Sequence, residues 1–214
     1  GFEKEMQEIF ALLPSKRQNM LFSATLSDQL AGINRVLLSN PEVVEVKDNA
    51  EDVELINLSG YFVSDERKGP LLRHLLRENE MSQVLVFTSS GVKADAVARK
   101  LYNNGFEADS IHGKKSQFAR LKALEDFKSG KIQVLVATDL ISRGIDFLEL
   151  PYVINYELPR SPKDFVHRVG RTGRAKTEGL AITFVTRDET HHFKVILKKM
   201  KRYIDMVDSE TLDF

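Results

Sequence analysis

The chain has 214 residues, enough for one large domain or for a domain and part of another, and 42% of them are hydrophobic, which can supply a buried core. Its 31 basic and 31 acidic side chains cancel, so any surface for a nucleic acid has to arise from local segregation of charge. The absence of cysteine excludes disulfides, zinc fingers and thiol catalysis. With no apolar run of about 20 residues and no signal-peptide pattern, we expect a cytoplasmic protein without a membrane span.

The first 48 residues contain too few predicted elements to close a sheet. The hydrophobic pattern predicts a helix over Phe2–Leu13, a strand over Asn19–Phe22, a helix over Asp28–Leu38 and a strand over Val43–Val46. A polar, acidic stretch follows over residues 48–52. We interpret residues 1–48 as the end of an upstream domain, the rest of which is missing here, and residues 49–58 as an interdomain linker.

From residue 59 to residue 207, short β-branched runs alternate with longer helical patterns. This alternation is typical of repeated βαβ units that form a parallel sheet with helices on both faces. The predicted strands are Tyr61–Val63, Val84–Thr88, Ala108–Ile111, Gln133–Ala137, Tyr152–Tyr156 and Leu180–Val185. The predicted helices are Glu66–Glu78, Gly91–Asn104, Ser116–Ser129, Pro162–Val169 and Asp188–Arg202. Residues 208–214 are expected to be a tail.

Polar residues follow three of these strands, where an open parallel sheet usually forms its ligand site. Thr88 and Ser89 follow the second strand, and their hydroxyls can bind phosphates; Ser90 is better explained as the cap of the next helix. Gly113 follows the third strand, in a basic segment that continues to Gln117 and Arg120 on one helical face. This pattern suits a nucleic-acid strand, although a solvated basic face is the alternative.

The fourth predicted strand is followed by a dense group of polar residues, from Thr138 to Asp146. Thr138 is placed to reach a phosphate oxygen, and Asp146 to accept a hydrogen bond from a ribose hydroxyl. Asp139 and Arg143 can form a positioning pair, or an ordinary buried ion pair.

The octet over residues 167–174, His-Arg-Val-Gly-Arg-Thr-Gly-Arg, is the most informative motif. Arg171 and Arg174 lie three residues apart, and each guanidinium offers a planar fork of donors that suits phosphate oxygens. The pair is therefore a candidate arginine finger for phosphoryl transfer, with a solvated basic turn as the alternative.

These motifs, taken in chain order, resemble those of the DEAD-box ATP-dependent RNA helicases. Tyr61–Val63, Asn155–Pro159 and the compact end look most like the bacterial members of that family. The resemblance covers essentially the whole chain and rests on five segments in the family's order. They are Ser23-Ala24-Thr25, the strand that ends at Phe87, His112-Gly113 with Gln117 and Arg120, Thr138 to Asp146, and the octet. It implies a RecA-like second domain preceded by a remnant of the first RecA-like domain.

The resemblance also implies a role for each matching residue. Arg171 and Arg174 would be catalytic and, with Gly144 and Asp146, would bind ATP. The residues implied in interdomain coupling are Ser23, Thr25, Asp139, Arg143, His167 and Arg168. The residues implied in binding the RNA sugar-phosphate backbone are Thr88, Ser89, Gly113, Gln117, Arg120 and Thr138.

The chain departs from the family's full pattern because it contains no phosphate-binding loop of the form Gly-x4-Gly-Lys-Ser/Thr and no Asp-Glu-Ala-Asp. The resemblance thus implies that ATP with Mg²⁺ is bound mainly by an upstream domain, and that this chain holds no metal and is inactive alone. The partners implied are RNA and the upstream RecA-like domain, in a monomer. A catalytically silent module that binds RNA or a protein is the alternative function. A dinucleotide-binding oxidoreductase is disfavoured because no Gly-x-Gly-x-x-Gly fingerprint is present.

One basic run lies outside these motifs. It comprises Lys194, Lys198, Lys199, Lys201 and Arg202. It can extend the RNA surface or solvate the last helix, and we favour the solvated face.

Overall fold

The computed structural model describes residues 3–22, 42–44, 56–139, 150–173 and 178–214. The chain divides into two compact units, Gly1–Lys47 and Asp48–Phe214. Among the described residues, no helix is both long enough and apolar enough to cross a bilayer.

The first unit contains helix α1 (Glu3–Ala11). The strand predicted over Asn19–Phe22 is wrong, because these residues are irregular and the side chains of Met20 and Phe22 are exposed. The pattern is apolar enough for a strand, but a strand also needs a neighbour to accept its hydrogen bonds. The predicted helix over residues 28–38 lies outside the described residues, and residues 42–44 are irregular.

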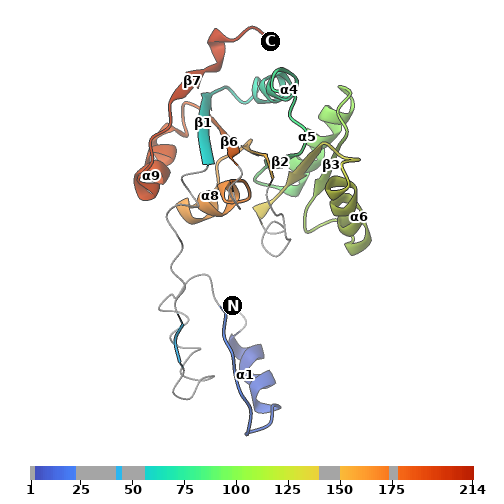
Figure 1. The fold of residues 1–214 in the computed structure, drawn as a ribbon, viewed down its shortest axis with the longest axis vertical. Helices are drawn as coiled ribbons and strands as arrows, with labels where there is room; N and C mark the ends of the chain where they lie inside the picture. The colour runs from blue at the N-terminus through green and yellow to red at the C-terminus, as the bar shows by residue number, and fades with distance from the viewer. Residues whose placement is uncertain (1–2, 23–41, 45–55, 140–149, 174–177) are drawn as a thin grey trace. The chain divides into compact units, whose positions relative to one another are not determined.

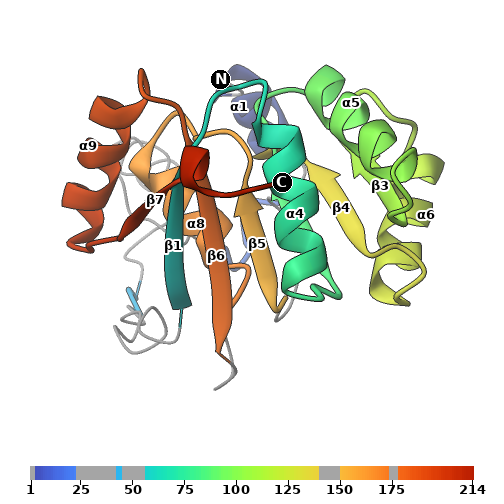
Figure 2. The same ribbon diagram turned by 90° about the horizontal axis from the view of Figure 1, so that it is seen from above.

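The second unit is a seven-stranded parallel sheet with the strand order β3-β4-β2-β5-β6-β1-β7 (Figures 1 and 2). The strands are β1 (Ile56–Phe62), β2 (Val84–Phe87), β3 (Ala108–Ile111), β4 (Val134–Ala137), β5 (Tyr152–Asn155), β6 (Gly179–Val185) and β7 (Met206–Asp208). The helices are α4 (Lys68–Glu78), α5 (Gly91–Tyr102), α6 (Gln117–Lys128), α8 (Pro162–Val169) and α9 (Thr190–Met200). The parallel α/β class expected from the sequence is thereby confirmed.

Two hydrophobic clusters, one on each face of the sheet, hold the layers together. Along β2, Val84 and Val86 pack in the cluster beneath α4 and α5, whereas Leu85 and Phe87 pack in the cluster beneath α6, α8 and α9. Side chains that alternate between two covered faces must all be apolar, so these strands read as continuous hydrophobic runs.

The structure differs from the sequence-based boundaries at both ends of this unit. Strand β1 begins at Ile56, so residues 56–58 belong to the sheet and not to the linker. The segment expected to be a tail instead continues the fold, since β7 ends at Asp208 and a short 3-10 helix covers Ser209–Thr211. Contacts with Arg67, in the turn before α4, hold these last residues against the domain. The Arg67 guanidinium donates to the carbonyl oxygens of Ser209 and Leu212 and lies 4.5 Å from the centre of the Phe214 ring.

Candidate functional site

A pocket of about 490 Å³ lies where four neighbouring strands, β3, β4, β2 and β5, end. Each of the loops that follow these strands contributes to its wall. The lining residues are Ser89, Ser90, Gly91, His112, Gly113, Lys114, Thr138, Asp139, Leu158, Pro159, Arg160, Asp164 and Arg168. Hydroxyls, two glycines and two exposed cations, Lys114 and Arg160, line this space together with the carboxylates of Asp139 and Asp164, which accept hydrogen bonds from Arg168 and Ser161. With these carboxylates engaged, the composition suits an anionic ligand.

The residues predicted to bind RNA lie in this pocket or beside it. Ser89, Gly113 and Thr138 line the pocket, whereas Thr88 is fully buried and its hydroxyl donates to the carbonyl oxygen of Ser90. Gln117 and Arg120 lie together in the first turns of α6, where the Arg120 guanidinium donates to the Gln117 side-chain oxygen. The segment that carries Gly113 leads directly into this helix.

The helix that follows Ser90 begins as the sequence predicts. The Ser90 hydroxyl accepts a hydrogen bond from the backbone N–H of Lys93 at 3.3 Å, which confirms its role as the cap of α5. The first turn of α5, starting at Gly91, therefore opens at the edge of the pocket. Its remaining backbone N–H groups give this edge partial positive charge.

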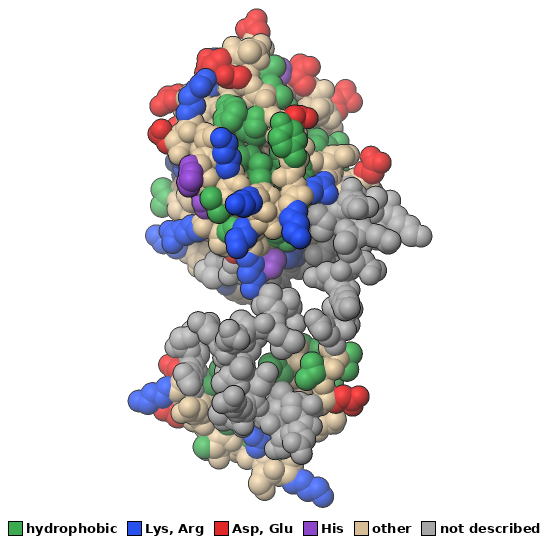
Figure 3. Space-filling model, turned by 90° about the vertical axis from the view of Figure 1, so that its left-hand side faces the viewer, with side chains coloured by type: hydrophobic (Ala, Val, Ile, Leu, Met, Phe, Trp, Pro, Cys, Tyr) green, Lys and Arg blue, Asp and Glu red, His purple; other side chains and the backbone are tan. Residues whose placement is uncertain are grey.

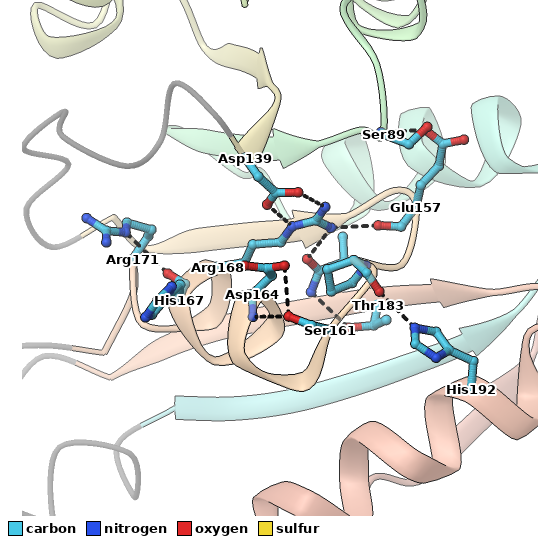
Figure 4. A network of polar contacts seen from close by, with 12 residues as sticks. Ser89, Asp139, Glu157, Ser161, Asp164, His167, Arg168, Arg171, Thr183 and His192 are labelled. Carbon is cyan, nitrogen blue, oxygen red and sulfur yellow. Dashed lines mark hydrogen bonds and ion pairs between the residues drawn. The ribbon is translucent and has the colours of Figure 1, made fainter. Parts of the chain in front are cut away.

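Arg168 of α8 is buried beneath the pocket and joins three loops (Figure 4). Its Nε and Nη2 donate to the two carboxylate oxygens of Asp139 at 2.6 and 2.7 Å, and its Nη1 donates to the backbone oxygen of Glu157 at 2.7 Å and to Asn155 Oδ1 at 3.2 Å. The guanidinium also lies 5.0 Å from the centre of the Phe87 ring. A single side chain, 2% exposed, therefore fixes the ends of β2, β4 and β5 relative to α8.

Asn155 is held in place by the register of the sheet. Residue 155 pairs with residue 183 across β5 and β6, and Asn155 Nδ2 donates to the hydroxyl of Thr183 at 3.2 Å. This bond leaves the amide oxygen of Asn155 directed toward Arg168. Both residues are buried, so the pair orients the arginine without water.

The carboxylate of Glu157 accepts both hydrogen bonds that Ser89 can donate. Its Oε2 accepts from the backbone N–H and from the hydroxyl of Ser89, both at 2.8 Å, and its Oε1 lies 3.5 Å from Lys93 Nζ. Burial tends to raise the pKa of Glu157, but the Ser89 hydrogen bonds and the charges of Lys93 and Lys68 outweigh it and hold this pKa below its ordinary value. The carboxylate is thus ionised at neutral pH, and it lies where two donors can also meet a phosphate.

His112 lines the pocket, and Asp95 of α5 holds its imidazole ring in place. Its Nε2 lies 2.9 Å from Asp95 Oδ1, which also accepts from the Ser110 hydroxyl at 2.5 Å. Because a carboxylate only accepts, Nε2 must carry the proton. The ring packs against Gly91, where a β-carbon would lie 2.7 Å from Nδ1. These contacts set the path of the chain just before Gly113.

The candidate arginine finger begins directly after α8. Arg171 is half-buried; its Nε donates to the carbonyl oxygen of His167 at 3.2 Å, and its own carbonyl accepts from the N–H of Leu150 at 3.1 Å. The next residue, Thr172, is fully buried and donates to the carbonyl oxygen of Pro151. The backbone that carries Arg171 is therefore anchored, and its side chain is half-buried beside α8.

Several residues predicted from the sequence lie outside the described residues. They are Ser23, Thr25, Arg143, Gly144, Asp146 and Arg174. Within the described part of the chain, the structure brings Asp139 and Arg168 into direct contact, and it places His167 beside Arg171.

Sequence reasoning assigned no role to Asn155, Glu157, His112 or Asp95. Asn155 ends β5 and Glu157 follows it by two residues, so the rule that singled out the ends of β2 and β4 applies to them as well. Asp95 was not recognisable, because an isolated carboxylate on a helix gives no sign that it meets a histidine from the next strand.

Comparison with known proteins assigns the chain to a family. Residues 67–176 match the model of the helicase conserved C-terminal domain. The DEAD-box ATP-dependent RNA helicase CshA of Geobacillus kaustophilus is 37% identical over 215 residues, a match that covers all of this chain and 46% of that protein. The ATP-dependent RNA helicase CshA of Listeria monocytogenes is 35% identical, with 41% of its length covered. The chain therefore spans less than half the length of these relatives.

Solved structures agree with this assignment. S. cerevisiae Dbp5 bound to RNA and ADP BeF3 superimposes with a TM-score of 0.82 at 26% identity, over 98% of this chain and 56% of that one. A DEAD box protein from Methanococcus jannaschii gives a TM-score of 0.69 at 33% identity, over 96% of this chain and 55% of that one. By sequence and by fold, this chain belongs to the helicase conserved C-terminal domain family and to the DEAD-box group within it.

Proposed function

We propose that this chain is the C-terminal half of an ATP-dependent RNA helicase, in which it supplies an arginine finger and half of the RNA-binding surface. The observation that carries the proposal is the pocket at the ends of β3, β4, β2 and β5, which gathers the predicted RNA contacts Ser89, Gly113 and Thr138. The intact protein would use ATP binding to close two domains on RNA and so to separate or remodel a short duplex. ATP hydrolysis would then reopen the domains.

The pocket is suited to a sugar-phosphate backbone. The hydroxyls of Ser89 and Thr138 and the backbone beside Gly113 can meet phosphate oxygens, while Lys114 and Arg160 supply positive charge. The carboxylate of Asp139 is already neutralised by Arg168 and need not repel the ligand. Contacts of this kind do not distinguish bases, so binding should be independent of sequence.

The catalytic contribution of this half is electrostatic. The backbone of Arg171 is anchored by the Leu150 N–H and by the buried Thr172, so its guanidinium would approach the γ-phosphate when the domains close and would stabilise the charge of the transition state. Arg174 is proposed to act with it. Gly144 and Asp146 would contact the nucleotide, whereas an upstream domain would bind most of the ATP.

The remaining groups belong to the coupling between domains or to that upstream domain. Mg²⁺ would be held there with the phosphates and would neutralise their charge. Ser23, Thr25, Asp139, Arg143, His167 and Arg168 would link the nucleotide state to the RNA site. Of these, Asp139 and Arg168 would act as one unit, since they share two hydrogen bonds.

ATP hydrolysis tests this proposal, measured with and without single-stranded RNA on this chain alone and on the chain joined to an upstream domain. We expect activity only in the joined, RNA-bound protein. There, Arg171→Ala should lower the rate by a factor on the order of 10³ to 10⁵, the usual contribution of an arginine finger. Unchanged hydrolysis in that variant would refute the assignment, and no hydrolysis in any form would favour a catalytically silent RNA-binding module.

A further inference from the structure

Helix α9 and the turn after it concentrate positive charge in a chain whose total charge is balanced. Residues 190–203 contain five basic residues and no acidic one. These basic residues are Lys194, Lys198, Lys199, Lys201 and Arg202, and the four lysines are exposed. Figure 3, which faces the side of the domain that carries α9, shows Lys and Arg gathered over this part of the surface. We call residues 191–203 the α9 surface.

The stability of the helix does not explain this charge. Cations near the C-terminus of a helix are favoured by its dipole, and this accounts for Lys198 and Lys199 in the last turn. Lys194 lies in the first half of α9, where the dipole gives it no such advantage. In the ranges that the structure describes, no carboxylate forms an ion pair with any of these four lysines.

Acidic side chains flank this segment in the sequence, and Asp205, four residues after Lys201, is exposed; within the described residues it forms no ion pair with the lysines. Glu189, just before α9, accepts from the backbone and the hydroxyl of Thr186 and lies 3.9 Å from Lys68. Asp208 pairs with Arg187 at 3.1 Å. The lysines are therefore left to attract an external anion.

The first turn of α9 contacts the rim of the pocket, and most of the lysines lie on the part of the helix turned away from this contact. His192 Nε2 in the first turn of α9 lies 2.8 Å from the carbonyl oxygen of Pro159, and Pro159 and Arg160 line the pocket. The rings of Phe165 and Phe193 lock α8 to α9 beneath this contact, with centroids 6.1 Å apart. A strand that leaves the pocket past Arg160 would meet the first turn of α9 and would have to cross the exposed face of the helix to reach the lysines.

An aromatic side chain ends the α9 surface. Tyr203 follows the last lysine by two residues and is 83% exposed, so its ring is available to solvent. Cations followed by an exposed aromatic ring are the combination that binds single-stranded nucleic acid, since the cations meet phosphates and a base stacks on the ring. Lys194 and Lys198 are separated by about 6 Å along the helix axis, so they can meet different phosphates.

We infer that the α9 surface binds single-stranded RNA that continues beyond the pocket, with Lys194, Lys198 and Lys201 on its phosphates and Tyr203 beneath a base. This inference rests on the proposed function, because it takes the pocket to be the RNA site. On this inference, a long RNA binds more tightly than a short one because only the long RNA reaches α9.

The first experiment compares a short oligouridine that fills only the pocket with a longer one, both titrated into the 214-residue chain. The test variant combines Lys194→Gln, Lys198→Gln and Lys201→Gln. The control combines Lys100→Gln, Lys128→Gln and Lys131→Gln, which removes the same charge from exposed positions on α5, on α6 and in the turn after α6.

The expected loss concerns the long RNA only. Each phosphate contact to a single strand contributes about 0.7 to the slope of log affinity against log salt, so three contacts contribute about 2. From 50 to 200 mM salt, affinity for the long RNA should then fall about 20-fold more in the wild type than in the test variant. The short RNA should bind both proteins equally, and the control should behave as the wild type.

A second experiment exploits the absence of tryptophan from the chain. Tyr203→Trp introduces a single fluorophore into the α9 surface, and Tyr102→Trp introduces one at another exposed tyrosine, on α5. The long RNA should quench the first fluorophore and not the second, and the short RNA should quench neither.

The inference would be overturned if the test variant and the control lost the same affinity for the long RNA. It would also be overturned if RNA quenched the tryptophan of the Tyr102→Trp variant and not that of the Tyr203→Trp variant. In either case the α9 lysines would be a solvated face. If neither RNA binds the wild type at all, the proposed function fails as well, so the two failures can be told apart.

Discussion

The substitution Arg168→Met tests the part of the site that the structure describes most completely. Methionine keeps most of the length and apolar volume of the side chain but removes the guanidinium. The change deletes two hydrogen bonds to Asp139, one to Asn155 and one to the backbone oxygen of Glu157. It also removes the contact with the Phe87 ring.

The cost can be estimated from the burial of the partners. Asn155 is fully buried, so its amide oxygen would lose its donor without access to water, and the Glu157 carbonyl would lose its donor too; each loss costs about 1–3 kcal/mol. Asp139 is about a third exposed, so its carboxylate can be rehydrated and contributes at the lower end of this range. The free energy of unfolding should fall by about 3–5 kcal/mol, as for a broken buried ion pair.

Urea denaturation followed by circular dichroism measures this change, through a lower midpoint at an unchanged slope. Arg99→Met is the matched control, because Arg99 is exposed on α5, and it should change stability by no more than about 0.5 kcal/mol. Arg168→Lys should fall between the two, since an ammonium cannot reproduce the bidentate contact. A loss below about 1 kcal/mol for Arg168→Met would refute the reasoning that the Arg168 contacts fix the pocket loops.

Glu157 and Gly179 allow further tests. Glu157→Gln removes a carboxylate from the donors of Ser89, so RNA titrations should show tighter binding, and weaker binding would argue against this pocket as the phosphate site. Because the pKa of Glu157 is lowered in the fold, its carboxylate stabilises the protein above the ordinary value of 4.5, and this contribution disappears as pH falls through the lowered value. Denaturation at pH 7 and under acid should therefore show the gap between wild type and Glu157→Gln closing, whereas a constant gap would exclude this linkage. Gly179→Ala would place a methyl group against the Thr172 hydroxyl and should lower the melting temperature by an amount equivalent to about 1–3 kcal/mol; an unchanged value would show that the contact can relax.

The strands of the second unit could be predicted because they carry one dominant signal. Val84 to Phe87 and Val134 to Ala137 are buried on both faces, and burial of that kind leaves no polar positions to confuse the pattern. The short strand β7 could not be predicted, since three residues are too few for a period and it pairs with β1, a strand far away in the sequence. At Asn19–Phe22 the apolar pattern predicts a strand that does not form, because no neighbouring strand in the described structure accepts its hydrogen bonds.

Within the candidate site, residues could be predicted where several polar or charged side chains lie close together in the sequence. Thr138 and Asp139 stand side by side after a strand, and Arg168 and Arg171 belong to one motif. The partnership of Arg168 with Asn155 depends instead on sheet register, and that of Glu157 with Ser89 depends on the adjacency of β2 and β5. A single sequence contains neither piece of information, because each arises only when distant strands align.

The position of β1 in the sheet has a consequence for biosynthesis. Strand β1 is made first but lies between β6 and β7, pairing residue 56 with 179 and residue 60 with 206. At about 5–20 residues per second, a ribosome needs on the order of ten seconds to deliver β6 after β1 has been translated. During that interval the nascent chain displays an apolar strand with both edges open, which is the state that chaperones recognise and aggregation exploits. The same order means that cleavage or truncation before Met206 would leave β1 exposed along one side, at the edge of the domain farthest from β3.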